Sequence, residues 1–531
     1  MPRKGSMKVR TGCLVCKVRK IKCDETEPSC LRCTSTGRKC AGYTRRPQRS
    51  TGPLPANQLN HVFQGVTTQA LGRTLEHYSR VVGPALSSTE DGYFWTNIVL
   101  QFASFEPAVR HSVAAISLLY EHLDPAHCGR EITDREQYAS LVHYNAAIQE
   151  VKMMNASDKQ PVVLLVCILF VCIEMMQQDR QGAVRHCKHG FALLANCSTS
   201  RYRWAQQYLE PVLRRLTVFP FFFGRSDSDY PDLSHLPKSP QSAFESLSDA
   251  RYMLDQVFGQ ALRLYCLGDE YRIGPSRNSP VPQQLLKDQA TVIGLSMSWH
   301  TMFSVFIDRF AERAAAKELD PLMSKQFLLA RVYVCQIAAA MAFEKTETGY
   351  DSYTYMFRKV RQNLDSVAAL VHEKASNVAS ARPARTKFAF EMGFMPTICF
   401  CILKCRDLET RLRFWRLLPI LCQSQESLWQ LDSMIVADRK LIETEHGIHV
   451  DLMREDNCPS ELPPDSLRIR RMWVDSTPTR QEVNGRNVVG RMVGFTKVDK
   501  NGDPVYSKEF SEQYTEIVNG DAVINLSTVE D

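Results

Sequence analysis

The sequence predicts a mainly α-helical protein with a small cysteine-rich module, a flexible linker, a large all-α body and a short β-hairpin near its C-terminus. Three observations support this fold class. Cysteines with a repeated spacing lie between residues 13 and 40, apolar residues follow a helical period through most of residues 71–445, and strand-like alternation begins near residue 491. The cysteine module is predicted at residues 1–45 and the linker at residues 46–70. The helical body is predicted at residues 71–460 and the C-terminal segment at residues 461–531.

The cysteine module consists of two copies of the unit Cys-x2-Cys-x6-Cys. The second copy begins seventeen residues after the first, and the six residues are Cys13, Cys16, Cys23, Cys30, Cys33 and Cys40. A segment below about 40 residues buries too little apolar surface to fold unaided and needs a metal or disulfides. Disulfides require an oxidising compartment, and we expect none because the first residues contain no apolar run typical of a secretory signal. The spacing therefore favours metal binding over a disulfide framework.

Two zinc ions are the metal content that six thiolates predict. Two tetrahedral zinc ions have eight coordination positions, which six sulfurs fill if two of them bridge. The repeat predicts that the first cysteine of each copy is the bridge. One ion would then bind Cys13, Cys16, Cys23 and Cys30, and the other Cys30, Cys33, Cys40 and Cys13. Zinc contributes about 10–16 kcal/mol at such sites, so metal binding and folding of the module are expected to be one event.

Basic residues are concentrated on this module. The stretch between Cys16 and Cys23 contains Lys17, Arg19, Lys20 and Lys22, whereas the matching stretch of the second copy contains only Arg38 and Lys39. Residues 1–50 contain fourteen Lys and Arg residues against three acidic ones, although the whole chain has a net charge of only +7. This distribution is typical of a polyanion-binding head on a near-neutral body, and it predicts that the first copy contacts the partner.

The module resembles the fungal zinc binuclear cluster transcription factors. The resemblance rests on the run from Gly12 to Glu25, on Pro28 before Cys30, and on Gly42-Tyr43 after Cys40. It implies that a short helix enters the major groove of double-stranded DNA and that Lys20, with Arg19 beside it, reads a CGG-type triplet. Phosphate contacts would come from Lys17, Lys22, Arg38 and Lys39. The implied function is a nuclear regulator of genes transcribed by RNA polymerase II, with a preference for activation.

The body is predicted to be helical from its apolar periodicity. Three amphipathic segments are indicated by Leu71, Leu75, Tyr78 and Val82, by Val109, Val113, Ile116 and Tyr120, and by Tyr138, Leu141, Val142 and Ile148. The apolar run Pro161–Ile173 is shorter than the roughly 20 residues that span a bilayer, so it predicts a buried core helix and no membrane partner.

The body also resembles the helical regulatory region that follows the zinc cluster in one branch of the same family. The resemblance rests on Phe94-Trp95, Glu106–His111, Ala183–His186 with Gly190, and Cys405–Asp407. It implies that the helical body is regulatory and serves for homodimerisation or for response to an effector.

The C-terminal segment combines a hairpin pattern with an acidic end. Arg491–Val498 and Val505–Phe510 flank a turn containing Asn501-Gly502, which indicates a β-hairpin. Beyond Lys508 there are six acidic residues and no basic ones, interleaved with apolar residues. This composition is typical of an activation segment that binds a coactivator, and the alternative is an ordinary acidic tail.

No catalytic signature was found among the Gly-x-Ser-x-Gly, Walker, dinucleotide-binding and His-Glu-x-x-His patterns, so the sequence gives no reason to propose an enzyme. Two other functions stay open. One is a zinc-dependent adaptor that binds RNA or protein, and the other is a metal or redox sensor in which the thiolates are the switch. Only a DNA-binding regulator predicts a base-specific duplex site.

Overall fold

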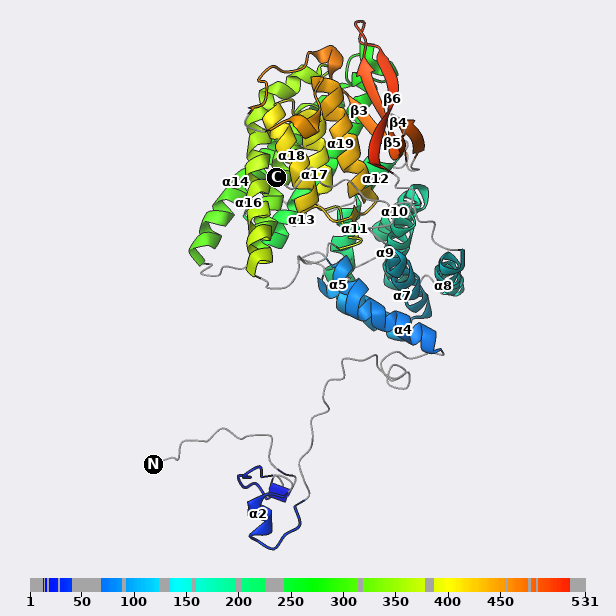
Figure 1. Ribbon diagram of the computed structural model, residues 1–531, viewed down its shortest axis with the longest axis vertical. Helices are drawn as coiled ribbons and strands as arrows, with labels where there is room; N and C mark the ends of the chain where they lie inside the picture. Colours follow the sequence, from blue (N-terminus) through cyan, green and yellow to red (C-terminus); the bar gives the residue numbers. More distant parts are fainter. Residues whose placement is uncertain are drawn as a thin grey trace. The chain divides into compact units, whose positions relative to one another are not determined.

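A computed structural model gives the structure of the chain. It describes residues 13, 15–16, 19–26, 29–40, 68–87, 92–123, 134–154, 159–196, 202–224, 243–313, 319–377, 386–454, 457–475, 479–483 and 486–515. The chain divides into two compact units, Met1–Leu59 and Asn60–Asp531, which are described separately. The predicted fold class is confirmed: a cysteine cluster near the N-terminus is followed by a mainly helical unit with strands near its end (Figure 1).

The unit Met1–Leu59 has cysteines at its centre. Val15 and Cys16 lie in a short helical turn, and α2 (Leu31–Thr34) is its counterpart in the second copy of the repeat. Cys13, Cys16, Cys30 and Cys33 are buried, with Val15, Cys23 and Cys40 packed around them. The described residues contain no larger apolar cluster in this unit, so the cysteines take the place of a hydrophobic core.

The first half of the unit Asn60–Asp531 is a group of helices around one apolar cluster. The helices are α4 (Gln69–His77), η1 (Tyr78–Val82), α5 (Gly83–Leu86), η2 (Phe94–Ile98), α6 (Val99–Phe105), α7 (Pro107–His122), α8 (Asp134–Met153), α9 (Gln160–Met176), α10 (Arg180–Asn196), η4 (Ala205–Leu209), α11 (Glu210–Leu216) and α12 (Phe219–Phe223). The predicted apolar faces of α4–η1 and α7 are buried, and Pro107 is the first residue of α7. The core-helix prediction for residues 161–173 is likewise confirmed, since α9 is buried along most of its length.

The face predicted for α8 is wrong, although the helix itself is present. Tyr138 is 68% exposed, and Leu141 and Val142 also face outward, whereas Tyr144 and Ala147 are buried. The reason is packing: α8 lies at the outer edge of the helical body against α7, so only one narrow side of it is covered (Figure 1). Tyr144 turns this side inward, because its hydroxyl donates to Glu174 of α9 at 2.6 Å.

The second half of this unit is built around another apolar cluster. Its helices are α13 (Leu247–Arg272), α14 (Gln283–Arg313), α15 (Leu319–Ala340), α16 (Thr354–Asn377), α17 (Met395–Lys404), α18 (Leu408–Leu421) and α19 (Leu431–His446). Within the described ranges, α14 is the one helix long and apolar enough to cross a membrane by length and composition alone. It packs against α13 and α15 with 28% of its apolar window buried, and the buried indole N–H of Trp299 donates to the Ala250 carbonyl at 2.7 Å.

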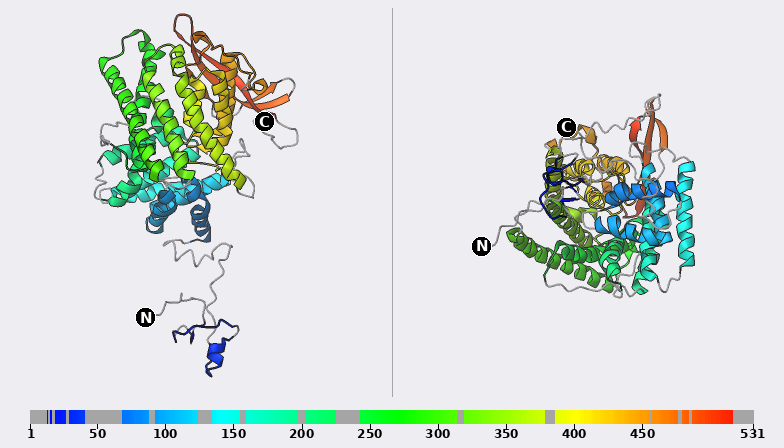
Figure 2. Two further views of the ribbon diagram at one scale, coloured as in Figure 1. Left: turned by 90° about the vertical axis from the view of Figure 1, so that its left-hand side faces the viewer. Right: turned by 90° about the horizontal axis from the view of Figure 1, so that it is seen from below.

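Strands lie at the C-terminal end of the chain. β1 (Gln425–Glu426) and β2 (Trp429–Gln430) form a small ladder, and β3 (Arg471–Val474), β4 (Thr479–Val483), β5 (Arg486–Val498) and β6 (Pro504–Thr515) form an antiparallel sheet. β5 is central: β6 pairs along one edge, and β3 and β4 share the other. The sheet packs beside α19 on one edge of the helical body (Figures 1 and 2).

The predicted hairpin is therefore confirmed, but it is longer than expected. β6 continues through Phe510 and Tyr514, which pair with Met492 and Val489 of β5. Ser511 is buried, and its hydroxyl donates to the Val436 carbonyl of α19 at 3.1 Å. Residues 509–515 of the predicted acidic segment thus belong to the folded sheet, and residues 516–531 lie outside the described residues.

Gly268 of α13 lies against the backbone of Ala342, just after the end of α15. A Cβ atom at this position would clash with the carbonyl oxygen of Ala342. We expect Gly268→Ala to lower the free energy of unfolding by about 1–3 kcal/mol or more, because neither backbone segment can move without disturbing the core. Gly294→Ala in α14 is the matched control: nothing lies within 4 Å of its Cβ position, so alanine should stabilise the helix by about 0.5–1 kcal/mol. Urea unfolding measures both effects, and equal values would contradict the close approach.

Candidate metal centre and nucleic-acid interface

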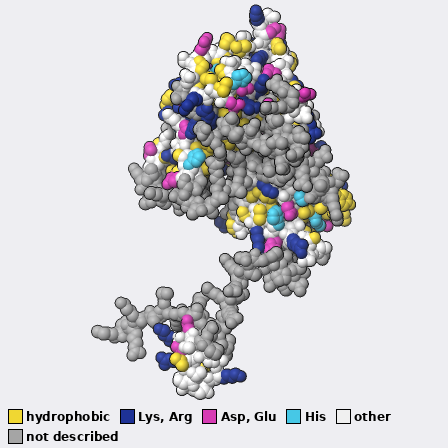
Figure 3. All heavy atoms as spheres, in the orientation of Figure 1, with side chains coloured by type: hydrophobic (Ala, Val, Ile, Leu, Met, Phe, Trp, Pro, Cys, Tyr) yellow, Lys and Arg dark blue, Asp and Glu magenta, His cyan; other side chains and the backbone are white. Residues whose placement is uncertain are grey.

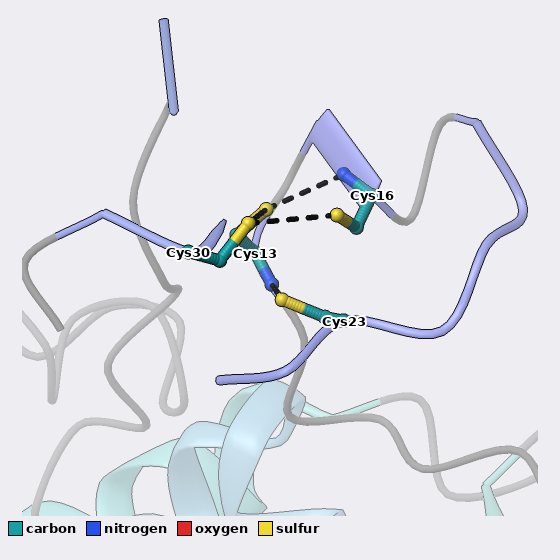
Figure 4. A group of neighbouring side chains, drawn as sticks. All are labelled: Cys13, Cys16, Cys23 and Cys30. Atoms are coloured by element: carbon teal, nitrogen blue, oxygen red, sulfur yellow. Dashed lines mark hydrogen bonds between the residues drawn. The ribbon is translucent and has the colours of Figure 1, made fainter. Parts of the chain in front are cut away.

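The structure brings all six predicted cysteines together in two groups of four. One group is Cys13, Cys16, Cys23 and Cys30, the other is Cys13, Cys30, Cys33 and Cys40, and within each group the Sγ atoms lie within 4.8 Å of one another. The Sγ atoms of Cys13 and Cys30, which both groups contain, are 3.6 Å apart, and those of Cys16 and Cys30 are 3.7 Å apart (Figure 4). Zinc–sulfur bonds of 2.3 Å in a tetrahedron place ligand sulfurs about 3.8 Å apart, so the spacing fits zinc. A disulfide bond of about 2.05 Å is far shorter than these separations.

Backbone N–H groups point at the sulfur atoms. Cys16 N–H donates to the Cys13 sulfur at 3.3 Å, and Cys13 N–H donates to the Cys23 sulfur at 3.5 Å (Figure 4). The N–H of Glu25 also donates to the Cys23 sulfur, at 3.5 Å. Such donors stabilise thiolates. Without metal, burial raises the pKa of the thiols of Cys16, Cys30 and Cys33 to about 12. Zinc must therefore displace protons when it binds, which couples metal affinity to pH.

The sequence repeat is also a repeat of backbone structure. After the first helical turn, Ile21 N–H donates to the Cys16 carbonyl at 3.1 Å, and after α2, Arg38 N–H donates to the Cys33 carbonyl at 3.0 Å. Each turn ends at a residue with positive φ, which is Gly37 (66°) in the second copy and Lys20 (55°) in the first. Glycine adopts this left-handed conformation freely, but a lysine does so at a cost of order 1–3 kcal/mol. A strained lysine replaces glycine at the end of the more basic copy.

Most of the predicted DNA-contacting residues are exposed. Lys20, Lys22, Arg38 and Lys39 all point to solvent, and Figure 3 shows several basic side chains on the described part of this unit. Arg19 is partly buried and donates from Nη1 to the Thr36 hydroxyl at 3.4 Å, so it links the two copies of the repeat. Lys17 lies outside the described residues, as does Pro28.

Asp24 is a site residue that sequence reasoning missed. Its carboxylate accepts the backbone N–H groups of Leu31 at 2.9 Å and Arg32 at 3.1 Å, which begin α2. The hydroxyl of Thr26 and these N–H groups hold the pKa of Asp24 well below its usual range. Cys30 at the start of α2 provides no side-chain cap, so Asp24, which directly follows the first copy, caps the helix of the second. Its position directly after Cys23 was the available signal.

Fold and site together define a binuclear zinc-cluster protein with a large helical body. Comparison with known proteins agrees, because residues 11–50 match the fungal Zn(2)-Cys(6) binuclear cluster domain. The donor geometry and this match indicate two zinc ions. Residues 11–50 thus resemble the zinc-cluster domain of the fungal Zn2Cys6 transcription factors, and longer stretches of the chain are similar to fungal transcription regulators.

Named relatives are regulators of transcription. The chain is 28% identical over 235 residues to the aspercryptin biosynthesis cluster-specific transcription regulator atnN of Emericella nidulans, covering 38% of this chain and 37% of that protein. It is 24% identical over 212 residues to the transcription regulator lscL of Purpureocillium lilacinum, covering 34% and 48%. Over 51 residues it is 49% identical to the transcription factor lfc1 of Flammulina velutipes, covering 10% and 18%. The chain thus spans less than half the length of these relatives, and no solved structure matches it.

Proposed function

We propose that this chain is a nuclear, sequence-specific DNA-binding regulator that recognises CGG-type sites through the first copy of its cysteine repeat. In this proposal Cys13 and Cys30 bridge two zinc ions, Cys16 and Cys23 complete one site, and Cys33 and Cys40 complete the other. Lys20 with Arg19 reads bases, and the phosphate contacts come from Lys17, Lys22, Arg38 and Lys39. The helical body would be the regulatory region and the surface for homodimerisation.

The observation that carries this proposal is the conformation of Lys20. A lysine in a left-handed turn costs stability, and its counterpart Gly37 occupies the same turn without strain. The position therefore favours glycine for folding, yet this chain has a lysine there, so its amine is available at a cost in backbone strain. An exposed amine at the end of a helical turn can donate to guanine O6 and N7 in a major groove, which is the commonest specific contact of basic side chains.

The variant Lys20→Gly distinguishes a role of Lys20 in base recognition from a role in folding of the zinc module. The variant should bind two zinc ions and fold at least as well as the wild type, because glycine relieves the backbone strain. We expect it to lose about 1–3 kcal/mol of discrimination at one base of the triplet. Binding of the zinc-loaded full chain to a randomised duplex pool measures this.

Lys22→Ala is the matched control, since it removes an exposed amine two residues away and should weaken binding uniformly across sequences. If Lys20→Gly keeps the base preference of the wild type, Lys20 does not read bases. If the wild type itself binds all duplexes alike, the adaptor function is favoured, and reversible zinc loss under mild oxidant would favour the sensor.

The proposal also includes activation of transcription, in which the acidic C-terminal segment binds a coactivator. Truncation after Thr515 preserves every described residue of β6 while removing four acidic residues, Glu516, Asp521, Glu530 and Asp531. We expect this truncation to abolish reporter activation without changing affinity for DNA. Replacing only these four residues by their amides is the matched control for charge. Unchanged reporter output from the truncated chain would contradict the proposal.

A further inference from the structure

A cavity of about 320 Å³ lies inside the unit Asn60–Asp531, at the seam between its two apolar clusters. Phe219 and Phe390 contribute from the first cluster, and Phe258 and Leu421 from the second. Met392, which packs against both clusters, also lines the cavity. Small-molecule sites commonly occupy such junctions and have volumes of about 300–1,000 Å³.

The cavity wall is mostly apolar and aromatic. Six phenylalanines line it: Phe219, Phe222, Phe258, Phe327, Phe390 and Phe394. Phe327 packs edge-on against Phe394, with ring centroids 5.1 Å apart, and Phe390 packs against Trp95 at 5.0 Å. Phe327 and Phe394 thus support each other within the wall, and Trp95, which does not line the cavity, supports Phe390, so the wall is preformed for an apolar ligand.

Charged groups on the wall favour an anion. Three arginines, Arg215, Arg251 and Arg331, line the cavity against the two carboxyl groups of Glu391 and Glu426. The guanidinium carbons of Arg251 and Arg331 lie 5.7 and 5.8 Å from the centre of the Phe327 ring, so an aromatic surface and two cations lie side by side.

Other protein groups hold several of these charges in place. Arg215 pairs with Glu391 at 2.5 Å, and Arg331 pairs with Asp255 at 2.5 Å. Glu426 accepts the N–H groups of Gly393 and Met395 at 2.9 and 3.1 Å. Burial raises the pKa of Glu426 to about 7, so it adds at most a partial negative charge at neutral pH. With Asp255 included, the described charged groups at the cavity are three guanidinium groups against Glu391, Asp255 and the partly protonated Glu426, which leaves an excess of at most one positive charge.

We propose that this cavity binds a small organic acid with an apolar, preferably aromatic, body and a single carboxylate. The phenylalanine wall would cover the body, and the guanidinium groups near Phe327 would bind the carboxylate through paired N–H donors. The inference concerns the helical body alone, so it can be tested whether or not the zinc cluster reads CGG sites.

The test is calorimetric titration of the full chain with 4-phenylbutyrate, indole-3-acetate and octanoate, each compared with its primary amide. We expect at least one acid to bind and its amide to bind about tenfold more weakly or not at all, because the amide lacks the charge that the guanidinium groups attract. Equal binding of acid and amide would overturn the recognition of a carboxylate. Absence of binding by all three acids at millimolar concentration would overturn the proposal.

Two variants locate the binding. Arg251→Met keeps an apolar stem and removes one guanidinium without breaking the ion pairs of Arg215 and Arg331, so binding of the acid should weaken about tenfold or more. Arg263→Met is the matched control, because Arg263 is an exposed residue of the same helix, and it should leave binding unchanged.

Ser324→Phe is a second test of the site that remains informative if Arg251→Met fails to fold. Ser324 lines the cavity, and a phenyl ring there should fill the empty volume and block the ligand while preserving the thermal unfolding midpoint. Unchanged binding in a folded Ser324→Phe protein would place the probe elsewhere and overturn the assignment of the site.

Discussion

Replacing Cys30 by serine is expected to release both zinc ions and unfold the N-terminal module. Cys30 and Cys13 belong to both groups of four sulfurs, so loss of either shared sulfur leaves each group with three. The module has no apolar core beyond the cysteines and their neighbours in its described part, and zinc contributes about 10–16 kcal/mol at sites of this kind. Native mass spectrometry of the full chain should show two zinc ions in the wild type and none in Cys30→Ser.

Two further cysteine variants make this result specific. Cys40 belongs to one group only, so Cys40→Ser should weaken one zinc site more than the other and leave a species with one ion. Cys458 donates to the Arg454 carbonyl in the helical unit, outside both groups, and Cys458→Ser should retain both ions. If Cys30→Ser behaves like Cys40→Ser, the sulfur of Cys30 is not shared between two metal ions.

Glu445→Ala is expected to lower the free energy of unfolding of the helical unit by about 3–5 kcal/mol. Glu445 at the end of α19 is fully buried and contacts two fully buried arginines: Arg406 Nη2 at 3.1 Å and Arg411 Nη1 at 2.7 Å. It also accepts the backbone N–H of Ile469 at 2.5 Å, just before β3. Removing the carboxylate leaves two guanidinium groups buried without it, which costs far more than the pair itself contributes.

A surface ion pair provides the control for Glu445→Ala. Glu409 pairs with Arg361 at 2.7 Å, but its side chain is 48% exposed. Glu409→Ala should therefore change the free energy of unfolding by less than about 1 kcal/mol. Urea unfolding of both variants at neutral pH measures the difference, and similar values would show that the buried network does not stabilise the unit.

The same carboxylate gives the network a defined pH dependence. Burial alone would raise the pKa of Glu445, but Arg406 and Arg411 outweigh this and lower it to about 2. An unfolded glutamate titrates near about 4.3, so the contribution to stability is fully present above that pH and is lost as pH falls towards 2. The stability difference between wild type and Glu445→Gln should accordingly shrink between pH 4 and pH 2.

The features that the sequence predicts well are those carried by local spacing. The cysteine repeat, the buried faces of α4 and α7, the apolar α9 and the Asn501-Gly502 hairpin each depend on residues close together in the chain. Tyr138 and Leu141 show the limit, because periodicity locates a helix but does not say which neighbour covers it.

Features that depend on distant residues could not be predicted in this way. Glu445 meets Arg406 across 39 positions, and the cavity collects side chains from α11, α13, α15 and the segment before α17. Asp24 caps a helix that begins seven residues later, and the sequence marks this role only by placing Asp24 directly after Cys23. From the sequence alone, Glu445, Arg406 and Asp24 look like ordinary charged surface residues, because their partners are known only once the fold is known.

The sharing of Cys13 and Cys30 between two groups of sulfurs has a consequence for metal loading in the proposed two-zinc arrangement. The first ion to bind either group orders both shared sulfurs, so the second ion finds half of its ligands already in position and loses less entropy on binding. In the proposed two-zinc arrangement the second ion would therefore bind more readily than an isolated site allows, and the two zinc sites of the module would tend to fill and empty together.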